Sequence, residues 1–265
     1  MIAGLHHVAV VVRDFDAAAD GYARLLGIAP QMQESDDGAR RAWFWLANMG
    51  LEVVAPDGGG PSAERLRRRL DEADEGQWLV ALASDDLEAD ARLFERRGLV
   101  VAERTERAVM FEPASTGGVQ VALMGFPPLS SRATDIPALD HVVVRTANID
   151  RAVANFGGRL GLDLRLDRAN EAWGARQLFF RCGEAVLEFG ASLKHPPSDG
   201  PDSFGGLAWR VPDPHAVHAR LAAAGFDVSE IRKGRKPGTH VFTVRDAPGG
   251  VPTLMIQPSP ALETT

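Results

Sequence analysis

The sequence repeats itself, and this repeat limits the fold more than any single motif does. The stretch LHHVAVVVRDFDAAADGYARLLG (5–27) returns as LDHVVVRTANIDRAVANFGGRLGL (139–162). His7 and His141 are 134 positions apart, and a Leu-Gly pair near the end of each stretch keeps the same spacing. Self-similarity at a constant spacing is typical of a chain built from copies of one supersecondary unit.

Two further pairs of stretches repeat in the same way. WFWLANMGLEVVAP (43–56) matches FFRCGEAVLEFGAS (179–192), and the match aligns a glutamate with a glutamate. More faintly, WLVALASDDLEADARLFERRGLVV (78–101) resembles GLAWRVPDPHAVHARLAAAGFDV (206–228). The repeat therefore has four copies, arranged as two pairs.

Each copy reads as a strand, a helix and about three more strands. β-branched runs bounded by turn residues predict the strands. In the first copy, Asp14 is placed to cap the start of a helix and Gly27 to end it. The sequence thus predicts four βαβββ units and an α+β fold class with mixed or antiparallel sheets.

The boundaries of the predicted domains follow from composition. FPPLSSRATDIP (126–137) is rich in proline and serine, as linkers are. We expect an N-terminal domain at 1–127, a linker at 128–137, a C-terminal domain at 138–258 and a loose tail at 259–265.

Composition excludes several classes of function. The formal net charge of −7 argues against a nucleic-acid-binding surface. Cys182 is the single cysteine, which excludes an intrachain disulfide and suits a reducing cytosol. The N-terminal stretch lacks the pattern of a signal peptide, and no apolar run is long enough to cross a bilayer. We therefore expect a cytoplasmic protein with a small-molecule ligand, and leave homodimer formation open.

Four βαβββ units with a histidine in a first strand and a glutamate in a last strand resemble the vicinal oxygen chelate superfamily. This superfamily includes glyoxalase I, extradiol dioxygenases and bleomycin-resistance proteins, and the resemblance covers roughly residues 4–257. It implies two glyoxalase-like domains whose sheets curl around a cavity. It also implies one divalent metal (Zn, Mn, Ni or Fe) that acts as a Lewis acid or activates dioxygen.

The resemblance assigns the metal ligands as His7, Glu52, His141 and Glu188. The second and fourth units depart from the family pattern, because their aligned positions carry no such ligands: Leu79 or Trp78, Ala122, Gly206 and Leu254. Each cavity would then hold one histidine and one glutamate, where metalloenzymes use three or four protein ligands. The sequence therefore leaves open whether a metal is bound.

Alternation along the strands separates the two halves of the chain. In the second half, Arg145 shares a face with His141, and Arg210 lies on the matching strand of the next unit. These arginines predict either recognition of a carboxylate, phosphate or enolate-type substrate or a structural ion pair between an arginine and a glutamate. His240 is either a missing ligand or general base, or a histidine at a strand edge.

Three aromatic residues on third strands, Trp43, Trp45 and Phe179, line a pocket or belong to the core. Because the walls of the first domain are small and apolar, we expect the second domain to be the active half.

Three functions remain. The first is a lyase or isomerase that acts on a small anionic or carbonyl-containing substrate by enolate-type chemistry. For this function, Glu188 is the base and His141 is a metal ligand or an acid. His240 is a further candidate catalytic residue, and Arg145 and Arg210 bind the anion. The alternative is a metal-free small-molecule-binding protein of the resistance or sequestration type. The third is a ring-cleaving dioxygenase.

Overall fold

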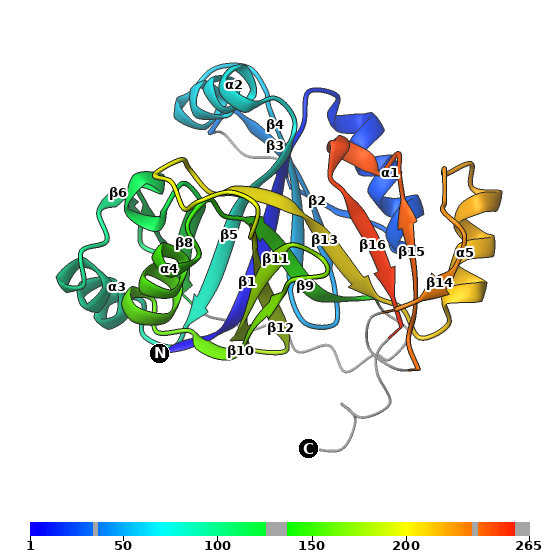
Figure 1. Ribbon diagram of the computed structural model, residues 1–265. Coiled ribbons are helices and arrows are strands. Elements are labelled where there is room, and N and C mark those ends of the chain that lie inside the picture. Colours follow the sequence, from blue (N-terminus) through cyan, green and yellow to red (C-terminus); the bar gives the residue numbers. More distant parts are fainter. Residues whose placement is uncertain (34–36, 126–136, 235–237, 258–265) are drawn as a thin grey trace. The chain divides into compact units, whose positions relative to one another are not determined.

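The computed structural model describes residues 1–33, 37–125, 137–234 and 238–257 (Figure 1). The first two repeats contain the strands β1 (Ile2–Val11), β2 (Gln31–Gln33), β3 (Ala39–Trp45), β4 (Gly50–Pro56), β5 (Gly76–Ser84), β6 (Val101–Arg104), β7 (Ala108–Phe111) and β8 (Gln120–Gly125). Their helices are α1 (Phe15–Leu26), α2 (Pro61–Ala73), α3 (Leu87–Arg96) and the 3₁₀-helix η1 (Pro113–Thr116).

The last two repeats contain the strands β9 (Ala138–Arg145), β10 (Asp163–Asn170), β11 (Ala175–Cys182), β12 (Ala185–Ser192), β13 (Ser203–Arg210), β14 (Arg232–Lys233), β15 (His240–Val244) and β16 (Thr253–Ile256). Their helices are α4 (Ile149–Ala152), the π-helix η2 (Val153–Arg159), α5 (Pro214–Ala223) and the 3₁₀-helix η3 (Pro248–Gly250). We call the sets β1–β4, β5–β8, β9–β12 and β13–β16 repeats 1 to 4.

The strands form two eight-stranded sheets with the same internal order. One sheet runs β2-β3-β4-β1-β5-β8-β7-β6, and the other runs β10-β11-β12-β9-β13-β16-β15-β14. The pairs β5–β8, β12–β9 and β13–β16 are parallel, whereas the hairpins of each repeat are antiparallel. The predicted α+β fold of four βαβββ units with mixed sheets is confirmed.

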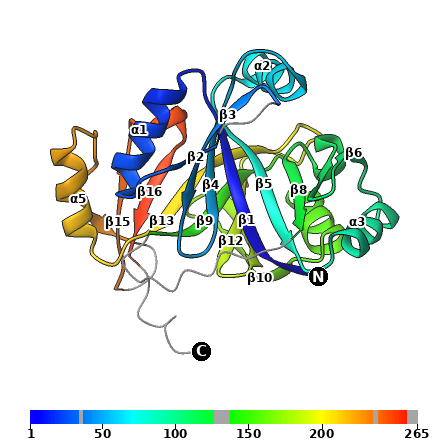
Figure 2. The ribbon, with the colours of Figure 1, turned by 180° about the vertical axis from the view of Figure 1, so that it is seen from behind.

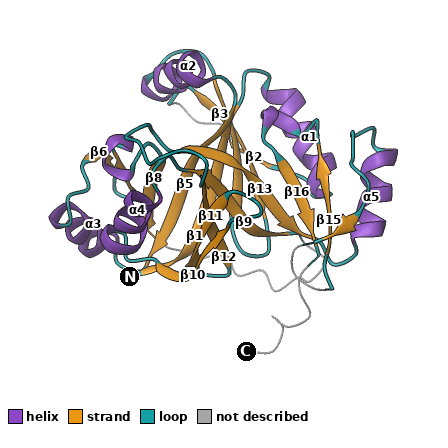
Figure 3. Cartoon of the chain, viewed as in Figure 1, coloured by secondary structure: helices purple, strands orange, loops and turns teal. Residues whose placement is uncertain are grey.

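The chain divides into two compact units. Unit 1 comprises Met1–Val8, Trp78–Leu129 and His141–Gly205, and unit 2 comprises Ala9–Gln77, Ser130–Asp140 and Gly206–Thr265. In unit 1, α3 packs against β7 and β8, and α4 against β12. In unit 2, α1 packs against β3 and β4, and α5 lies along β15, as Figures 2 and 3 also show.

The first helix begins and ends where its sequence indicates. Asp14 is the N-cap of α1, and its side chain accepts a hydrogen bond of 3.0 Å from the backbone N–H of Ala17. Gly27 ends the helix in the left-handed conformation, with φ of 72°. The helix buries Tyr22 and Leu25 against the sheet, which leaves the opposite face of the sheet for other residues.

The corresponding helix of repeat 3 has a different geometry. After one turn of α-helix it continues as the π-helix η2, which contains Gly157 and Gly158. Phe156 of this segment packs against Phe189, with ring centroids 4.5 Å apart, and all but 1% of its surface is buried. This aromatic core covers the helix-facing side of β11 and β12.

The predicted linker at 128–137 lies outside the described residues except for Pro137, and so does the tail at 259–265. No helix in the described ranges combines the length and the apolar composition needed to cross a membrane.

Candidate functional site

The side chains on the open side of β9, β11 and β12 form what we call the repeat 3 face. In the strand register Glu188 lies opposite Phe179 on one side and Val143 on the other. The residues that flank Glu188 in sequence, Leu187 and Phe189, point to the helix-covered core and are buried. Because side chains alternate along a strand, the residues on this face include His141, Val143, Arg145, Gln177, Phe179, Glu188 and Gly190.

Glu188 and His141 meet on this face. Nε2 of His141 lies 3.5 Å from Oε2 of Glu188, and the two side chains are 14% and 15% exposed. The other carboxylate oxygen, Oε1, accepts a hydrogen bond from Nε2 of Gln177. Oε1 of Gln177 in turn accepts one of 3.2 Å from Nη2 of Arg168, which β10 supplies. The structure therefore brings two predicted site residues together and adds two that the sequence did not indicate.

Arg145 lies beside an opening in the same face. It is level with Gly190 in the strand register, and a side-chain atom added at Gly190 would meet nothing within 4 Å. The guanidinium donates weak hydrogen bonds to the backbone carbonyls of Phe204 and Gly205, at 3.5 and 3.4 Å. Among the described residues, no carboxylate forms an ion pair with Arg145. Arg145 is therefore an exposed cation next to open space, which is a suitable position for binding an anionic ligand.

Arg210 and His240 belong to unit 2, so their contacts are described separately from those of the repeat 3 face. Nε of Arg210 lies 3.5 Å from a carboxylate oxygen of Asp140, and Nη2 donates to the backbone carbonyl of Leu139 at 3.0 Å. Nδ1 of His240 lies 3.0 Å from the side-chain oxygen of Gln257, and its ring faces that of His215 on α5. Arg210 thus pairs with an aspartate, whereas the structural alternative predicted from the sequence was a pair with a glutamate, and His240 lies against a helix.

Repeat 1 presents a matching face on β2, β3 and β4, which we call the repeat 1 face. Its residues are Gln31, Gln33, Arg41, Trp43, Trp45, Glu52 and Val54. Glu52 lies opposite Trp43, as Glu188 lies opposite Phe179. The two faces therefore hold a carboxylate and an aromatic ring at equivalent positions.

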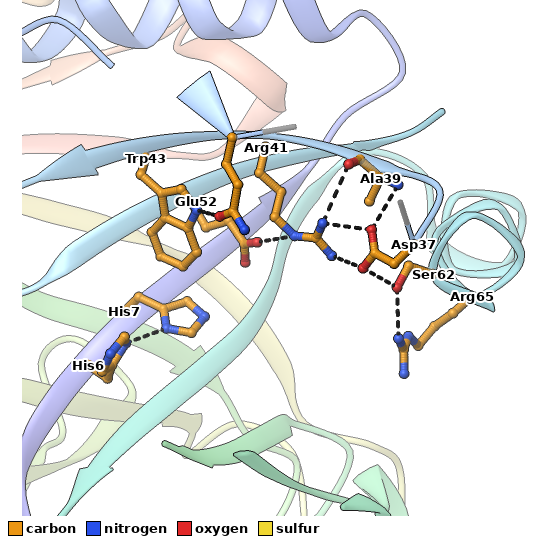
Figure 4. Close-up of polar contacts among 10 residues, drawn as sticks. His6, His7, Asp37, Ala39, Arg41, Trp43, Glu52, Ser62 and Arg65 are labelled. Carbon is orange, nitrogen blue, oxygen red and sulfur yellow. Dashed lines mark hydrogen bonds and ion pairs between the residues drawn. The ribbon is translucent and has the colours of Figure 1, made fainter. Parts of the chain in front are cut away.

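The Glu52 carboxylate is held by a guanidinium (Figure 4). Nε of Arg41 donates to Oε1 of Glu52 at 3.1 Å, and the two terminal nitrogens of Arg41 bind both carboxylate oxygens of Asp37 at 2.9 and 2.6 Å. Ser62 at the start of α2 donates to Asp37 at 2.8 Å, and Arg65 donates to Ser62 at 3.3 Å. This chain of contacts ties Glu52 to the helix α2.

Burial has the largest effect on the pKa of Glu52. Loss of hydration raises the pKa of its carboxyl to about 7, although the nearby Arg41 acts in the opposite direction. The pKa of Arg41 is raised, because hydrogen bonds to Asp37 and the two carboxylates outweigh its own loss of hydration. At neutral pH, Glu52 is therefore part protonated, within a hydrogen-bonded network centred on Arg41.

His7 is buried, with 3% of its surface exposed, and burial together with the neighbouring His6 lowers its pKa to about 3. The Nδ1 atoms of the two rings are 2.8 Å apart, and the rings pack edge to face (Figure 4). Strand alternation places His6 and His7 on opposite faces, yet their rings share a hydrogen bond. His7 is thus a neutral imidazole with a histidine partner.

Trp43 and Trp45 stack on the repeat 1 face, with centroids 5.0 Å apart and planes 11° from parallel. Each indole N–H donates to a glutamine of β2 at 2.8 Å, Trp43 to Gln33 and Trp45 to Gln31. Both rings are half-buried. These hydrogen bonds hold the two stacked rings in place.

The predicted metal ligands do not form a complete donor set. His141 and Glu188 supply two donors, and Arg41 already binds the carboxylate of Glu52. In the part of the chain that the structure describes, no three His, Cys, Asp or Glu side chains are arranged to hold a metal ion. Catalytic zinc uses three protein ligands, so these residues do not fit a metal held by the protein alone.

Strand alternation could have indicated Arg41 and Gln177. Each lies two residues before the aromatic residue of its face, so period-2 alternation puts it on that face. On these two strands the sequence pattern singled out only the aromatic residues Trp43, Trp45 and Phe179. Arg168 comes from the hairpin partner of β11, and no sequence signal gives that register.

Comparison with known proteins adds two findings. A family model described as the Glyoxalase/Bleomycin resistance protein/Dioxygenase superfamily matches residues 6–114 and 140–243. A search of curated protein sequences finds no match.

Among solved structures, the chain is similar to a mutant of 4-hydroxymandelate synthase from Streptomyces coelicolor. The TM-score is 0.78 at 14% identity, over 97% of this chain and 93% of that one. It is also similar to the Mn(II)-bound glyoxalase from Novosphingobium aromaticivorans, at a TM-score of 0.69 and 18% identity, over 97% and 82%. The halotolerant catechol dioxygenase BphC gives 0.69 and 13%, over 97% and 87%. At these identities the likeness shows the fold alone.

Proposed function

The chain belongs to the Glyoxalase/Bleomycin resistance protein/Dioxygenase superfamily, and from this premise we propose that it is a lyase or isomerase that moves a proton beside the carbonyl group of a small organic anion. One observation carries the proposal. On the repeat 3 face, Glu188 has one oxygen held by Gln177 and the other 3.5 Å from His141, next to an opening at Gly190.

Four residues of the repeat 3 face then have a role. Glu188 removes a proton from the carbon next to the carbonyl, and the C–H electron pair moves to the carbonyl oxygen to form an enolate. His141 lies close enough to Glu188 to share and return that proton. Arg145 binds the anionic group over Gly190, and the half-buried ring of Phe179 contacts the apolar part of the substrate.

The test is hydrogen exchange in D₂O, followed by proton NMR on two probes. Both 2-oxobutyrate and 2-oxo-4-phenylbutyrate carry a carboxylate for Arg145 and an exchangeable CH₂ group beside a carbonyl. We expect the protein to accelerate exchange, and Glu188→Gln to lower the rate about 100-fold or more while probe binding is retained. Glu171→Gln changes an exposed glutamate at the turn after β10 and is the matched control.

Two results would count against this function. Exchange by Glu188→Gln at the wild-type rate would remove Glu188 as the base. Equal exchange of 4-phenyl-2-butanone, which lacks the carboxylate, would remove the anion-binding role of Arg145.

A metal-free binding protein is the second candidate, because the donor set at Glu188 is incomplete and Trp43 and Trp45 form a fixed aromatic surface. This candidate expects binding of aromatic ligands with no exchange and no metal. Elemental analysis of protein purified without chelators or a histidine tag tests it. One Zn, Mn, Ni or Fe per chain would argue strongly against it.

Dioxygenase chemistry is supported by the fold to the same degree as lyase chemistry. We rank it lower because non-haem iron oxygenases use two histidines and one carboxylate, and the repeat 3 face offers His141 and Glu188.

A further inference from the structure

The carboxylate of Glu188 is the end of a chain of hydrogen bonds that begins outside the proposed reaction site. Nη2 of Arg168 donates to Oε1 of Gln177, and Nε2 of Gln177 donates to Oε1 of Glu188. Arg168 lies on β10 opposite Gln177 on β11, so the hairpin register brings them together. Three neighbouring strands thus contribute to the placement of one carboxylate.

The middle of this chain is a side chain that has two orientations. The oxygen and the nitrogen of a glutamine amide are nearly equal in size, so rotation by 180° costs little in packing. It reverses the hydrogen bonding, however, because the carbonyl oxygen would then face the Glu188 carboxylate. Two acceptors in contact repel each other, and Gln177 is only 8% exposed, so water cannot separate them.

Arg168 removes this ambiguity. A guanidinium carries only donors, so it bonds the amide oxygen of Gln177 and never the amide nitrogen. Its position is restricted in turn, because it lies over the ring of Trp173 at 5.2 Å from the centroid. The Nε of Arg168 is buried without a hydrogen-bond partner among the described residues.

Repeat 1 offers an internal comparison. At the position of Gln177 it has Arg41, which carries only donors and binds Glu52 in any orientation. At the position of Arg168 it has Gln33, whose oxygen accepts from Trp43. The orienting arginine therefore occurs beside the residue that needs orienting and is missing beside the one that does not.

We propose that Arg168 is a positioning residue: by fixing the amide of Gln177, it holds Oε1 of Glu188 and leaves Oε2 directed at His141. This inference rests on the proposed function for its catalytic consequence, whereas the amide orientation is a property of the protein alone. The two are therefore tested separately.

The orientation is tested by NMR of the side-chain amide of Gln177 in ¹⁵N-labelled protein, without substrate, with Gln177→Leu to assign the signal. In the wild type we expect slow exchange of the amide protons with solvent. Arg168→Met should shift the signal and speed this exchange about tenfold or more, and Arg168→Lys should restore much of the protection. Arg165→Met, on the same strand but with an exposed side chain, is the matched control. An unchanged Gln177 signal in Arg168→Met would overturn the proposal.

The catalytic consequence is tested by the exchange of 2-oxobutyrate in D₂O. Arg168→Met should lower kcat about 10- to 100-fold with little change in KM, since Arg168 orients the base and does not bind the substrate. A fall in kcat that Arg168→Lys does not rescue, or an effect on KM alone, would contradict the positioning role. If the wild type exchanges neither probe, the proposed function fails and the NMR result still decides whether Arg168 orients Gln177.

Discussion

Glu52 and Glu188 occupy the same position in two copies of one βαβββ unit, yet their surroundings differ in two ways. Glu52 is bound by the guanidinium of Arg41, whereas Glu188 is bound by the amide of Gln177. Val54 fills the position next to Glu52 on its strand, where Gly190 leaves open space in the other copy.

This difference shows how the same fold can hold one carboxylate, Glu52, in an ion pair and another, Glu188, in a hydrogen bond to a neutral amide. A guanidinium neutralises the charge of Glu52 and extends the network to Asp37 and the helix α2, so the carboxylate serves the structure. An amide holds Glu188 without neutralising it, and the second oxygen remains beside His141. We therefore propose that the residue two positions before the aromatic ring, Arg41 or Gln177, decides whether the carboxylate has a structural or a catalytic role.

The largest expected effect follows from removing the guanidinium. Arg41→Met leaves Glu52 and Asp37 without their shared cation, and we expect a loss of about 3–5 kcal/mol in the free energy of unfolding at pH 8. Gln177→Leu removes a neutral donor and should cost about 1–2 kcal/mol. Urea denaturation measures both.

The double variant Arg41→Met/Glu52→Leu is the control for this pair. It should recover much of the loss, because no buried carboxylate then remains without its cation at that position. Equal stability of Arg41→Met and Gln177→Leu would show that the two faces do not differ as we argue.

The pH dependence of stability tests the burial of Glu52. Its pKa is about 7 in the folded protein against an ordinary 4.5, so the folded state binds the proton more tightly. The contribution of Glu52 to stability is therefore highest below pH 4.5, falls between pH 4.5 and 7, and is constant above. The total fall is about 3 kcal/mol.

The measurement is the difference in unfolding free energy between wild type and Glu52→Gln at pH 5, 6, 7 and 8. The contribution of His7, whose pKa is lowered to about 3, is common to both proteins and cancels. A difference that does not change with pH would contradict the raised pKa.

Much of this site was predictable because strand alternation is a strict rule. From the repeat and the period of two, the sequence placed His141 and Arg145 on one face and aligned Glu188 with Glu52. These residues are on the predicted face in the structure. The caps of α1 at Asp14 and Gly27 were predictable for a similar reason, since both residue types act locally.

The hydrogen bonds of the site depend on distances between side chains of different strands, and the period of a sequence pattern does not predict these distances. Alternation puts Arg41 on the face of Glu52, but the hydrogen bonds to Glu52 and to Asp37 depend on side-chain reach and on the turn before β3. The π-helix after α4 contains Gly157 and Gly158, and the alignment of the two repeats alone did not predict it.

Placing the cation of the repeat 1 face on the repeat 3 face tests whether the residue beside Glu188 decides the role of that carboxylate. Gln177→Arg should bind Glu188 as Arg41 binds Glu52, and so lower the rate of exchange of 2-oxobutyrate about 100-fold. Gln177→Lys places a cation there without the planar fork of arginine, and we expect a smaller loss. Full activity in Gln177→Arg would mean that an ion pair does not disable this carboxylate.

The smallest expected effect concerns the open space at Gly190. Gly190→Val copies Val54 of repeat 1, and because Gly190 has no positive φ and no neighbour within 4 Å of the added atom, the fold should accept it. The new side chain would occupy the position between Arg145 and Gln177, and should raise KM for 2-oxobutyrate about tenfold with kcat little changed. Ala191→Val adds the same side chain on the other face of β12 and should change neither constant. If Gly190→Val lowered kcat and left KM unchanged, the space would belong to the reacting carbon, and the anion would have to bind elsewhere on the face.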